Sequence, residues 1–219
     1  MKICAIIPVY NESKAIGELV TEVRKQNIDV LVIDDGSKDN SADIARNNGA
    51  IVLKNITNQG KGASLLQGLN YVLNNNFDAA ILMDGDGQHL PQDIPAFIQK
   101  SRENGAALVL GNRMQDTRNM PPVRYLTNTT MSWLISKITG KNIPDSQCGF
   151  RFITKDLIEK LKFTTRHYET ESEMIIQAAQ AGYKIDSIAV KTVYRGEKSQ
   201  INPILDTLRF FLFIIRHIR

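Results

Sequence analysis

Short apolar segments alternate with helix-like periodicity along the first half of the chain, and this alternation is the feature that most constrains the fold. Five segments have the length of strands: Ile3–Val9, Val30–Ile33, Ile51–Leu53, Ala79–Met83 and Ala106–Leu110. Between them, apolar residues recur at helical spacing, as at Ile16, Leu19 and Val23. Strands without polar alternation, separated by helices, predict a mainly parallel sheet buried on both faces. The sequence therefore predicts an α/β fold.

The pattern changes after residue 112. A polar loop over 113–122 is followed by a predicted helix over 123–139, whose apolar positions are Val123, Leu126, Trp133, Leu134 and Ile138. A short strand near 150–153, a helix over about 170–181, a strand over about 184–193 and a helix from residue 203 complete the prediction. We expect a single domain over 1–202, with 1–112 and 113–202 as its two halves, and an amphipathic helix over 203–219.

Composition agrees with one globular domain of 219 residues, since 42% of the residues are hydrophobic and 23% are charged. The net charge of +4 suits a phosphate-rich ligand or an anionic membrane surface, and without a basic cluster it does not favour nucleic acid. Cys4 and Cys148 fit two reduced thiols of a cytosolic protein. No export signal is recognised, and no segment reaches the ~20 apolar residues of a membrane span.

Polar residues follow the predicted strands at the edge where open parallel sheets bind ligands. The segment Asp84-Gly85-Asp86-Gly87-Gln88 is the most specific of them. Two carboxylates two residues apart share a face, and the glycines let the backbone turn so that the acids and Gln88 converge. Such oxygen ligands suit Mg²⁺ or Mn²⁺. The alternatives are an Asp-Gly turn, which is equally compatible with the segment alone, and a calcium loop, which His89 and Pro95 contradict.

Two further segments point to a phosphate-containing ligand. A carboxylate of Asp34 or Asp35 could accept from a base or a ribose hydroxyl, although acids at this position often only cap a helix. Gly60-Lys61-Gly62 places a cation and small residues before a helix start, where backbone N–H groups favour an anion. Neither a dinucleotide-binding fingerprint nor a P-loop fits this spelling, because Leu65 and Gly62 stand where those motifs need other residues.

Taken in order, these segments resemble family 2 glycosyltransferases, most closely the polyprenyl-phosphate hexosyltransferases related to dolichyl-phosphate mannose synthase and dolichyl-phosphate glucosyltransferase. The matching segments are Ile-Ile-Pro-Val-Tyr-Asn-Glu, Val-Ile-Asp-Asp-Gly-Ser, Asn-Gln-Gly-Lys-Gly-Ala, Met-Asp-Gly-Asp-Gly-Gln-His, Gly-Asn-Arg, Cys-Gly-Phe-Arg and Arg-Gly-Glu-Lys-Ser. The resemblance extends from residue 3 to about residue 203. It implies the GT-A fold, a Rossmann-like sandwich around one mixed sheet.

The resemblance also implies roles for individual residues. The nucleotide sugar would be bound by Pro8, Tyr10, Glu12, Asp35, Lys61, Asp84, Gly85 and Asp86. A divalent cation would be held by Asp84, Asp86 and Gln88. The acceptor phosphate would be contacted by Arg113, Arg124, Arg195 and Ser199, and the catalytic set would be Asp86, Arg113, Asp145 and Arg195. The Asp145–Gly149 segment is spelled Asp-Ser-Gln-Cys-Gly where the family usually has Asp-Pro-Met-Ser-Gly.

We therefore expect an inverting, metal-dependent transfer of a hexose from UDP-glucose or GDP-mannose to a polyprenyl phosphate. A lipid phosphate is already ionised near neutral pH and needs no strong base, whereas a sugar hydroxyl needs one. For a hydroxyl acceptor the candidates are Asp145, Glu171 and Glu173; the last two also fit solvated acids at a helix start.

The predicted terminal helix carries an apolar stripe and late cations, so it fits a membrane interface or packing on a protein surface. We expect a cytoplasmic enzyme held peripherally at the cytosolic face of the membrane, with a membrane-protein partner or a homo-oligomer also compatible. Two other functions stay open from sequence: a family 2 transferase acting on a glycan hydroxyl, and a nucleotide-sugar-binding subunit without turnover.

Overall fold

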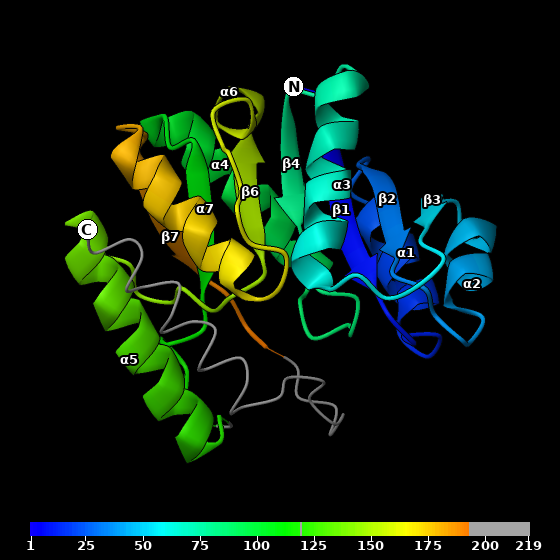
Figure 1. The fold of residues 1–219 in the computed structure, drawn as a ribbon, viewed down its shortest axis with the longest axis horizontal. Helices are drawn as coiled ribbons and strands as arrows, with labels where there is room; N and C mark the ends of the chain where they lie inside the picture. Colours follow the sequence, from blue (N-terminus) through cyan, green and yellow to red (C-terminus); the bar gives the residue numbers. More distant parts are fainter. Residues whose placement is uncertain (119, 193–219) are drawn as a thin grey trace.

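The computed structural model describes residues 1–118 and 120–192, which form a three-layer α/β domain around one sheet (Figure 1). The sheet has seven strands in the order β3-β2-β1-β4-β6-β5-β7. The strands are β1 (Ile3–Val9), β2 (Asp29–Asp34), β3 (Ile51–Lys54), β4 (Ala79–Leu82), β5 (Leu108–Asn112), β6 (Arg151–Thr154) and β7 (Ile185–Ala189). The predicted α/β class is confirmed.

Strand direction determines where the polar segments meet. β1 pairs in parallel with β2 and β4, β2 with β3, and β5 with β7. β6 is antiparallel to both β4 and β5, with Arg151 opposite Leu82 on one side and Leu110 on the other. The carboxyl ends of the parallel strands and the beginning of β6 therefore lie at the same edge of the sheet.

Helices cover both faces of the sheet. They are α1 (Ile16–Arg24), α2 (Ser41–Asn47), α3 (Lys61–Asn74), α4 (Ile94–Asn104), α5 (Pro122–Thr139), α6 (Lys155–Ile158) and α7 (Glu169–Gln180), with a 3₁₀ turn η1 (Pro91–Asp93) before α4. Buried residues of α1, α2 and α4 pack on one face, and those of α3, α5, α6 and α7 pack on the other. Alternate residues of β1 enter the two cores, Ile7 one and Ile6 the other, as expected for a strand buried on both sides.

Helix α5 forms where the sequence predicts it, but its apolar residues are not all buried. Val123, Leu126 and Trp133 are 78%, 66% and 57% exposed. These three residues lie on one side of the helix, and we call them the α5 apolar face. Figure 1 shows α5 at the lower left of the domain, and it packs against α7. Periodicity thus predicted the helix correctly, but not which apolar side chains the core would cover.

Candidate active site

The Asp84–Gln88 segment begins two residues after β4, at the edge where the parallel strands end. Its geometry is compact, since a Cβ on Gly85 would lie 2.9 Å from the Pro8 carbonyl oxygen, so only glycine allows this approach to β1. The backbone N–H of Gln88 donates to Asp86 Oδ1 at 2.9 Å. The predicted turn at the strand end is present, and the three residues proposed as metal ligands lie on this one short loop.

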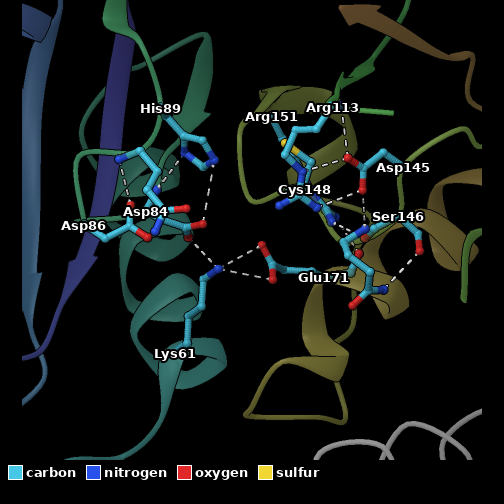
Figure 2. A network of polar contacts seen from close by, with 12 residues as sticks. Lys61, Asp84, Asp86, His89, Arg113, Asp145, Ser146, Cys148, Arg151 and Glu171 are labelled. Carbon is cyan, nitrogen blue, oxygen red and sulfur yellow. Dashed lines mark hydrogen bonds and ion pairs between the residues drawn. The ribbon is translucent and has the colours of Figure 1, made fainter. Parts of the chain in front are cut away.

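Lys61 joins the two halves of the domain. Its Nζ lies 2.5 Å from Asp84 Oδ1 and 3.2 Å from both carboxylate oxygens of Glu171, which belongs to α7. Figure 2 shows the lysine side chain reaching up between these two acids. Lys61, in the first turn of α3, therefore connects that helix both to the first turn of α7 and to the carboxylate that follows β4.

The charges of this group stabilise one another. Burial alone would lower the pKa of Lys61, but the carboxylates of Asp84 and Glu171 outweigh it, so the pKa lies above its ordinary value. For Asp84, burial works to raise the pKa, while Lys61 and the other nearby donors hold it well below the usual range. Asp84 is therefore a carboxylate, and it faces cations.

His89 contacts both the backbone and the carboxylate of Asp84. The Asp84 backbone N–H donates to His89 Nδ1 at 3.2 Å, and His89 Nε2 lies 3.8 Å from Asp84 Oδ2 (Figure 2). The ring stacks on Phe150, with centroids 5.1 Å apart. Burial lowers the pKa of His89 to about 4, so the imidazole is neutral at pH 7 and its Nδ1 accepts.

Arg113 and Asp145 form a buried ion pair. Nε and Nη2 of Arg113 donate to the two carboxylate oxygens of Asp145 at 2.8 and 2.9 Å, and the Arg113 backbone N–H adds a bond of 3.1 Å. Asp145 is 0% exposed and Arg113 is 5% exposed. Of the predicted catalytic residues, these two are joined directly, and the aspartate orients the guanidinium.

Asp35 holds the chain that leads into α3. Its carboxylate accepts from Asn55 Nδ2 at 2.8 Å, from the Gln59 N–H at 2.9 Å and from the Gly60 N–H at 2.8 Å. Any contact with a nucleotide would add to these bonds. Tyr10 and Glu12 lie on the loop after β1, where Ser41 Oγ accepts from the Glu12 N–H at 2.8 Å.

The start of α3 differs from the anion site predicted for Gly60-Lys61-Gly62. The Ala63 N–H donates to the Arg166 carbonyl at 2.9 Å, and a Cβ on Gly60 would lie 2.5 Å from His167 Nδ1. The glycines are needed because the segment before α7 packs against this helix start. The side chain of Lys61, rather than an open row of backbone N–H groups, is what this segment supplies to the site.

Glu171 and Glu173 of α7 are buried, which corrects the alternative that they are solvated acids at a helix start. Glu173 is 0% exposed and accepts from the backbone N–H and the hydroxyl of both Thr164 and Thr165. Glu171 is 6% exposed and is paired with Lys61. Their partners lie in other segments, so helical position alone could not identify them.

Not every predicted site residue is tested by these contacts. Arg124 is on α5, half-buried. Arg195, Ser199 and the predicted helix over 203–219 lie outside the described residues. Their assignments stay predictions.

His89, Arg151 and Asn128 are buried polar side chains that were not given a role from sequence. Arg151 is 0% exposed and binds three backbone carbonyls. Asn128, on α5, is 5% exposed, and its Nδ2 has no hydrogen-bond partner within the described part of the chain. His89 and Arg151 each end a segment that carries the family resemblance, and Arg151 is also a charged residue at the start of an apolar strand. Nothing local distinguished Asn128.

The oxygen donors of the Asp84–Gln88 segment fit a hard divalent cation. Two carboxylates and one amide supply the ligand type that Mg²⁺ and Mn²⁺ prefer while leaving positions for phosphate oxygens. Over residues 1–118 and 120–192, no cluster of three or more His, Cys, Asp or Glu side chains is arranged for a metal ion. A cation here would therefore rely on Asp84, Asp86, Gln88 and oxygens of the ligand.

Comparison with known proteins agrees with this geometry. The family model described as "Glycosyl transferase family 2" matches residues 4–162, and the chain belongs to this family of glycosyltransferases. The UDP-N-acetylglucosamine–dolichyl-phosphate N-acetylglucosaminyltransferase of Methanococcus voltae is 32% identical over 212 residues, covering 86% of this chain and 84% of that protein. The undecaprenyl-phosphate mannosyltransferase of Micrococcus luteus is 29% identical over 222 residues, covering 94% and 90%.

A solved structure shows the same fold. Glucosyl-3-phosphoglycerate synthase from Mycobacterium tuberculosis, in complex with Mn²⁺ and UDP-glucose, aligns with a TM-score of 0.74 at 17% identity. The alignment covers 97% of this chain and 78% of that one. The domain is thus a GT-A glycosyltransferase fold, as the resemblance implied.

Proposed function

We propose that the protein transfers a hexose from a nucleotide diphosphate sugar, UDP-glucose or GDP-mannose, to a polyprenyl phosphate with inversion at the anomeric carbon. The polyprenyl-phosphate relatives support the acceptor class. The solved complex with UDP-glucose and Mn²⁺ supports the donor class and the cation. The reaction would take place at the cytosolic face of the membrane.

On the donor side, the demand is to stabilise the nucleoside diphosphate as it leaves. A divalent cation held by Asp84, Asp86 and Gln88 would supply positive charge to its phosphates. Lys61 is fixed at the same point by two carboxylates, so its ammonium is in place before the donor binds. Asp35 directly follows β2, and its carboxylate accepts from the backbone N–H groups of Gln59 and Gly60. These bonds fix the start of α3, and hence Lys61, relative to β2.

The observation that carries the acceptor assignment is that each acid considered as a base is already occupied. Asp145 receives Arg113 through two side-chain bonds, Glu173 binds Thr164 and Thr165, and Glu171 binds Lys61. A hydroxyl acceptor needs a base with an available oxygen, whereas an ionised phosphate needs only cations to position it. The geometry therefore favours a phosphate acceptor over a glycan hydroxyl.

Asn128 supports a phosphate site beside Arg113. Ser132, one helical turn further along α5, accepts from the Ser146 N–H at 2.9 Å, next to the Asp145 that holds Arg113. Asn128 shares this side of the helix, and its buried amide N–H₂ lacks a partner among the described residues. A phosphate oxygen would satisfy that donor.

The α5 apolar face would bring this site to a lipid surface. Residues 121–142 contain Arg124, Lys137 and Lys141 and no acidic residue, so the exposed apolar side chains stand among cations. Trp133 is a residue type that favours the boundary between water and lipid. In the described part of the chain no helix is long and apolar enough to span a bilayer, so α5 would lie along the surface.

Membrane contact is measurable through Trp133, because it is the one tryptophan of the 219 residues. We expect its fluorescence to shift to shorter wavelength with vesicles containing anionic lipid, and less with neutral vesicles. Leu126→Ser should weaken vesicle binding about tenfold, the loss expected for one buried leucine. Ile56→Ser is the matched control, since Ile56 is 99% exposed on a loop remote from α5. Equal binding by the two variants would mean that α5 does not contact lipid.

The proposal is tested by incubating the protein with Mn²⁺, a set of nucleotide sugars and a polyprenyl phosphate. We compare UDP-glucose, GDP-mannose and UDP-N-acetylglucosamine as donors. A chelator tests whether transfer depends on a metal ion. A β- or α-specific glycosidase tests the anomeric configuration of the product. A lipid-linked hexose is the expected product. Product only with a sugar acceptor would favour the glycan transferase, and tight nucleotide-sugar binding without product would favour the non-catalytic subunit.

A further inference from the structure

Arg151 is a fully buried cation that the reaction as proposed does not use. It is the first residue of β6, it is 0% exposed, and none of the ion pairs among the described residues involves it. Burying a charge without a carboxylate partner is costly, and a protein interior usually avoids it. The presence of a buried arginine at this position therefore indicates that its hydrogen bonds have a role that an apolar side chain could not fill.

Those bonds go to backbone carbonyls of two separate segments. Nε donates to the Cys148 carbonyl at 2.9 Å, Nη2 to the Ser146 carbonyl at 2.8 Å and Nη1 to the Glu171 carbonyl at 2.5 Å. The planar guanidinium can bind three acceptors at once because its five N–H donors point in fixed directions. A lysine or a neutral side chain could not reproduce this geometry.

The Asp145–Gly149 segment has no helix or strand to hold it in place. Two of its carbonyls, those of Ser146 and Cys148, are bound by Arg151. At the start of the same segment Asp145 binds Arg113, the proposed acceptor-phosphate residue. At its end, a Cβ on Gly149 would lie 2.6 Å from both carboxylate oxygens of Asp84. The position of this one segment therefore sets two sides of the site.

The position of Arg151 in the sheet explains why its side chain reaches the Asp145–Gly149 segment. Arg151 lies opposite Leu82 and Leu110, close to where β4 and β5 lead to Asp84 and Arg113. Figure 2 shows the Arg151 side chain near Cys148 and Ser146, with Arg113 and Asp145 beside them. The third contact, to α7, is the least dependent on Arg151, because α7 is also anchored by buried apolar residues such as Met174 and Ile175.

We infer that Arg151 is a positioning residue that fixes the Asp145–Gly149 segment and, through Asp145, aims the Arg113 guanidinium at the acceptor phosphate. The predicted effect of Arg151 on sugar transfer rests on the proposed function, whereas its predicted effect on the position of the Asp145–Gly149 segment is independent of that function.

Cys148 provides a readout of the segment that is independent of activity. Its thiol is 0% exposed, and burial raises its pKa to about 12, so it should not react with iodoacetamide in the folded protein at pH 8. Cys4, in β1, is 1% exposed, and its pKa is raised in the same way, which makes it an internal control. In Arg151→Met we expect Cys148 to react about tenfold faster while Cys4 stays protected, because only the segment opens.

Transfer should be affected on the acceptor side. In Arg151→Met we expect kcat/KM for the polyprenyl phosphate to fall about 10–100-fold. The affinity for nucleotide diphosphate and Mn²⁺ should fall less, because Asp84 is also held by Lys61 and His89. Arg151→Lys should be intermediate in both readouts, since it keeps the charge but cannot bind three carbonyls. Val23→Ala, in the core of α1, controls for general loss of stability: it should lower Tm without changing Cys148 reactivity or the acceptor kinetics.

The outcomes separate this inference from the proposed function. If the wild type transfers no sugar to lipid, the function proposed above is wrong, and the alkylation of Cys148 still decides whether Arg151 holds the segment. If Arg151→Met does not fold, Arg151→Lys is measured in its place. A protected Cys148 together with acceptor kinetics no worse than those of Val23→Ala would overturn the inference.

Discussion

Replacing Asp86 by alanine is expected to reduce sugar transfer by about 10²–10³-fold or more, the cost of losing one element of leaving-group stabilisation. Asp86 is half-buried on the loop after β4, it belongs to neither hydrophobic core, and its Oδ1 accepts from the Gln88 N–H. The substitution should therefore leave the fold intact. Transfer to polyprenyl phosphate and Mn²⁺ affinity in the presence of UDP or GDP are the measurements.

Asp43→Ala is a suitable control for Asp86→Ala, because Asp43 is an exposed acid on α2 that forms an exposed ion pair with Arg46. It should change neither measurement. Full activity of Asp86→Ala, or transfer that survives an excess of chelator, would remove Asp86 and the cation from the proposed mechanism.

Breaking the buried ion pair is expected to have the largest effect on stability. Asp145→Asn leaves the Arg113 guanidinium buried without its counter-charge, which costs about 3–5 kcal/mol of the free energy of unfolding. That is a large share of the roughly 5–15 kcal/mol that holds a typical domain folded. Urea unfolding measures the loss, and transfer should be lost with it because Arg113 is no longer oriented.

Two further variants test whether the loss of stability in Asp145→Asn comes from the unpaired charge of Arg113. Asp116→Asn removes the acid from an exposed pair, where Arg118 Nη2 lies 2.6 Å from Asp116 Oδ2, and should leave stability unchanged within error. The double variant Arg113→Met with Asp145→Asn should regain part of the stability, because no charge is left unpaired, but not the transfer activity. Recovery of transfer in the double variant would contradict a role for Arg113 at the phosphate.

Much of the donor half could be predicted from the sequence, since its signals are local. The apolar runs of β1, β2, β3 and β4 fixed both the strands and their parallel direction, and the Asp84–Gln88 turn could be read directly from its acids and glycines. The predicted ends of these strands agree with the observed ends to within about two residues. Parallel strands that follow one another along the chain leave few alternative arrangements.

The acceptor half was less predictable, because its structure depends on contacts between distant segments. The antiparallel direction of β6 does not follow from four residues of sequence. Glu171 looks like a solvated acid by its place in α7, and only the fold reveals that Lys61, 110 residues away, is its partner. The periodicity of α5 likewise says nothing about which of its apolar residues a neighbouring element covers, and Trp133 is exposed.

The direction of β6 has a consequence for how this architecture diversifies. Because the chain leaves the sheet at the end of β5 and re-enters beside it through β6, residues 113–150 form an excursion with both ends at the same place. Such an excursion can lengthen, shorten or change its chemistry without altering the register of the strands that carry the donor residues. Under the proposed function, this one insert would determine what receives the sugar, while the remaining scaffold would keep the way in which the sugar is delivered.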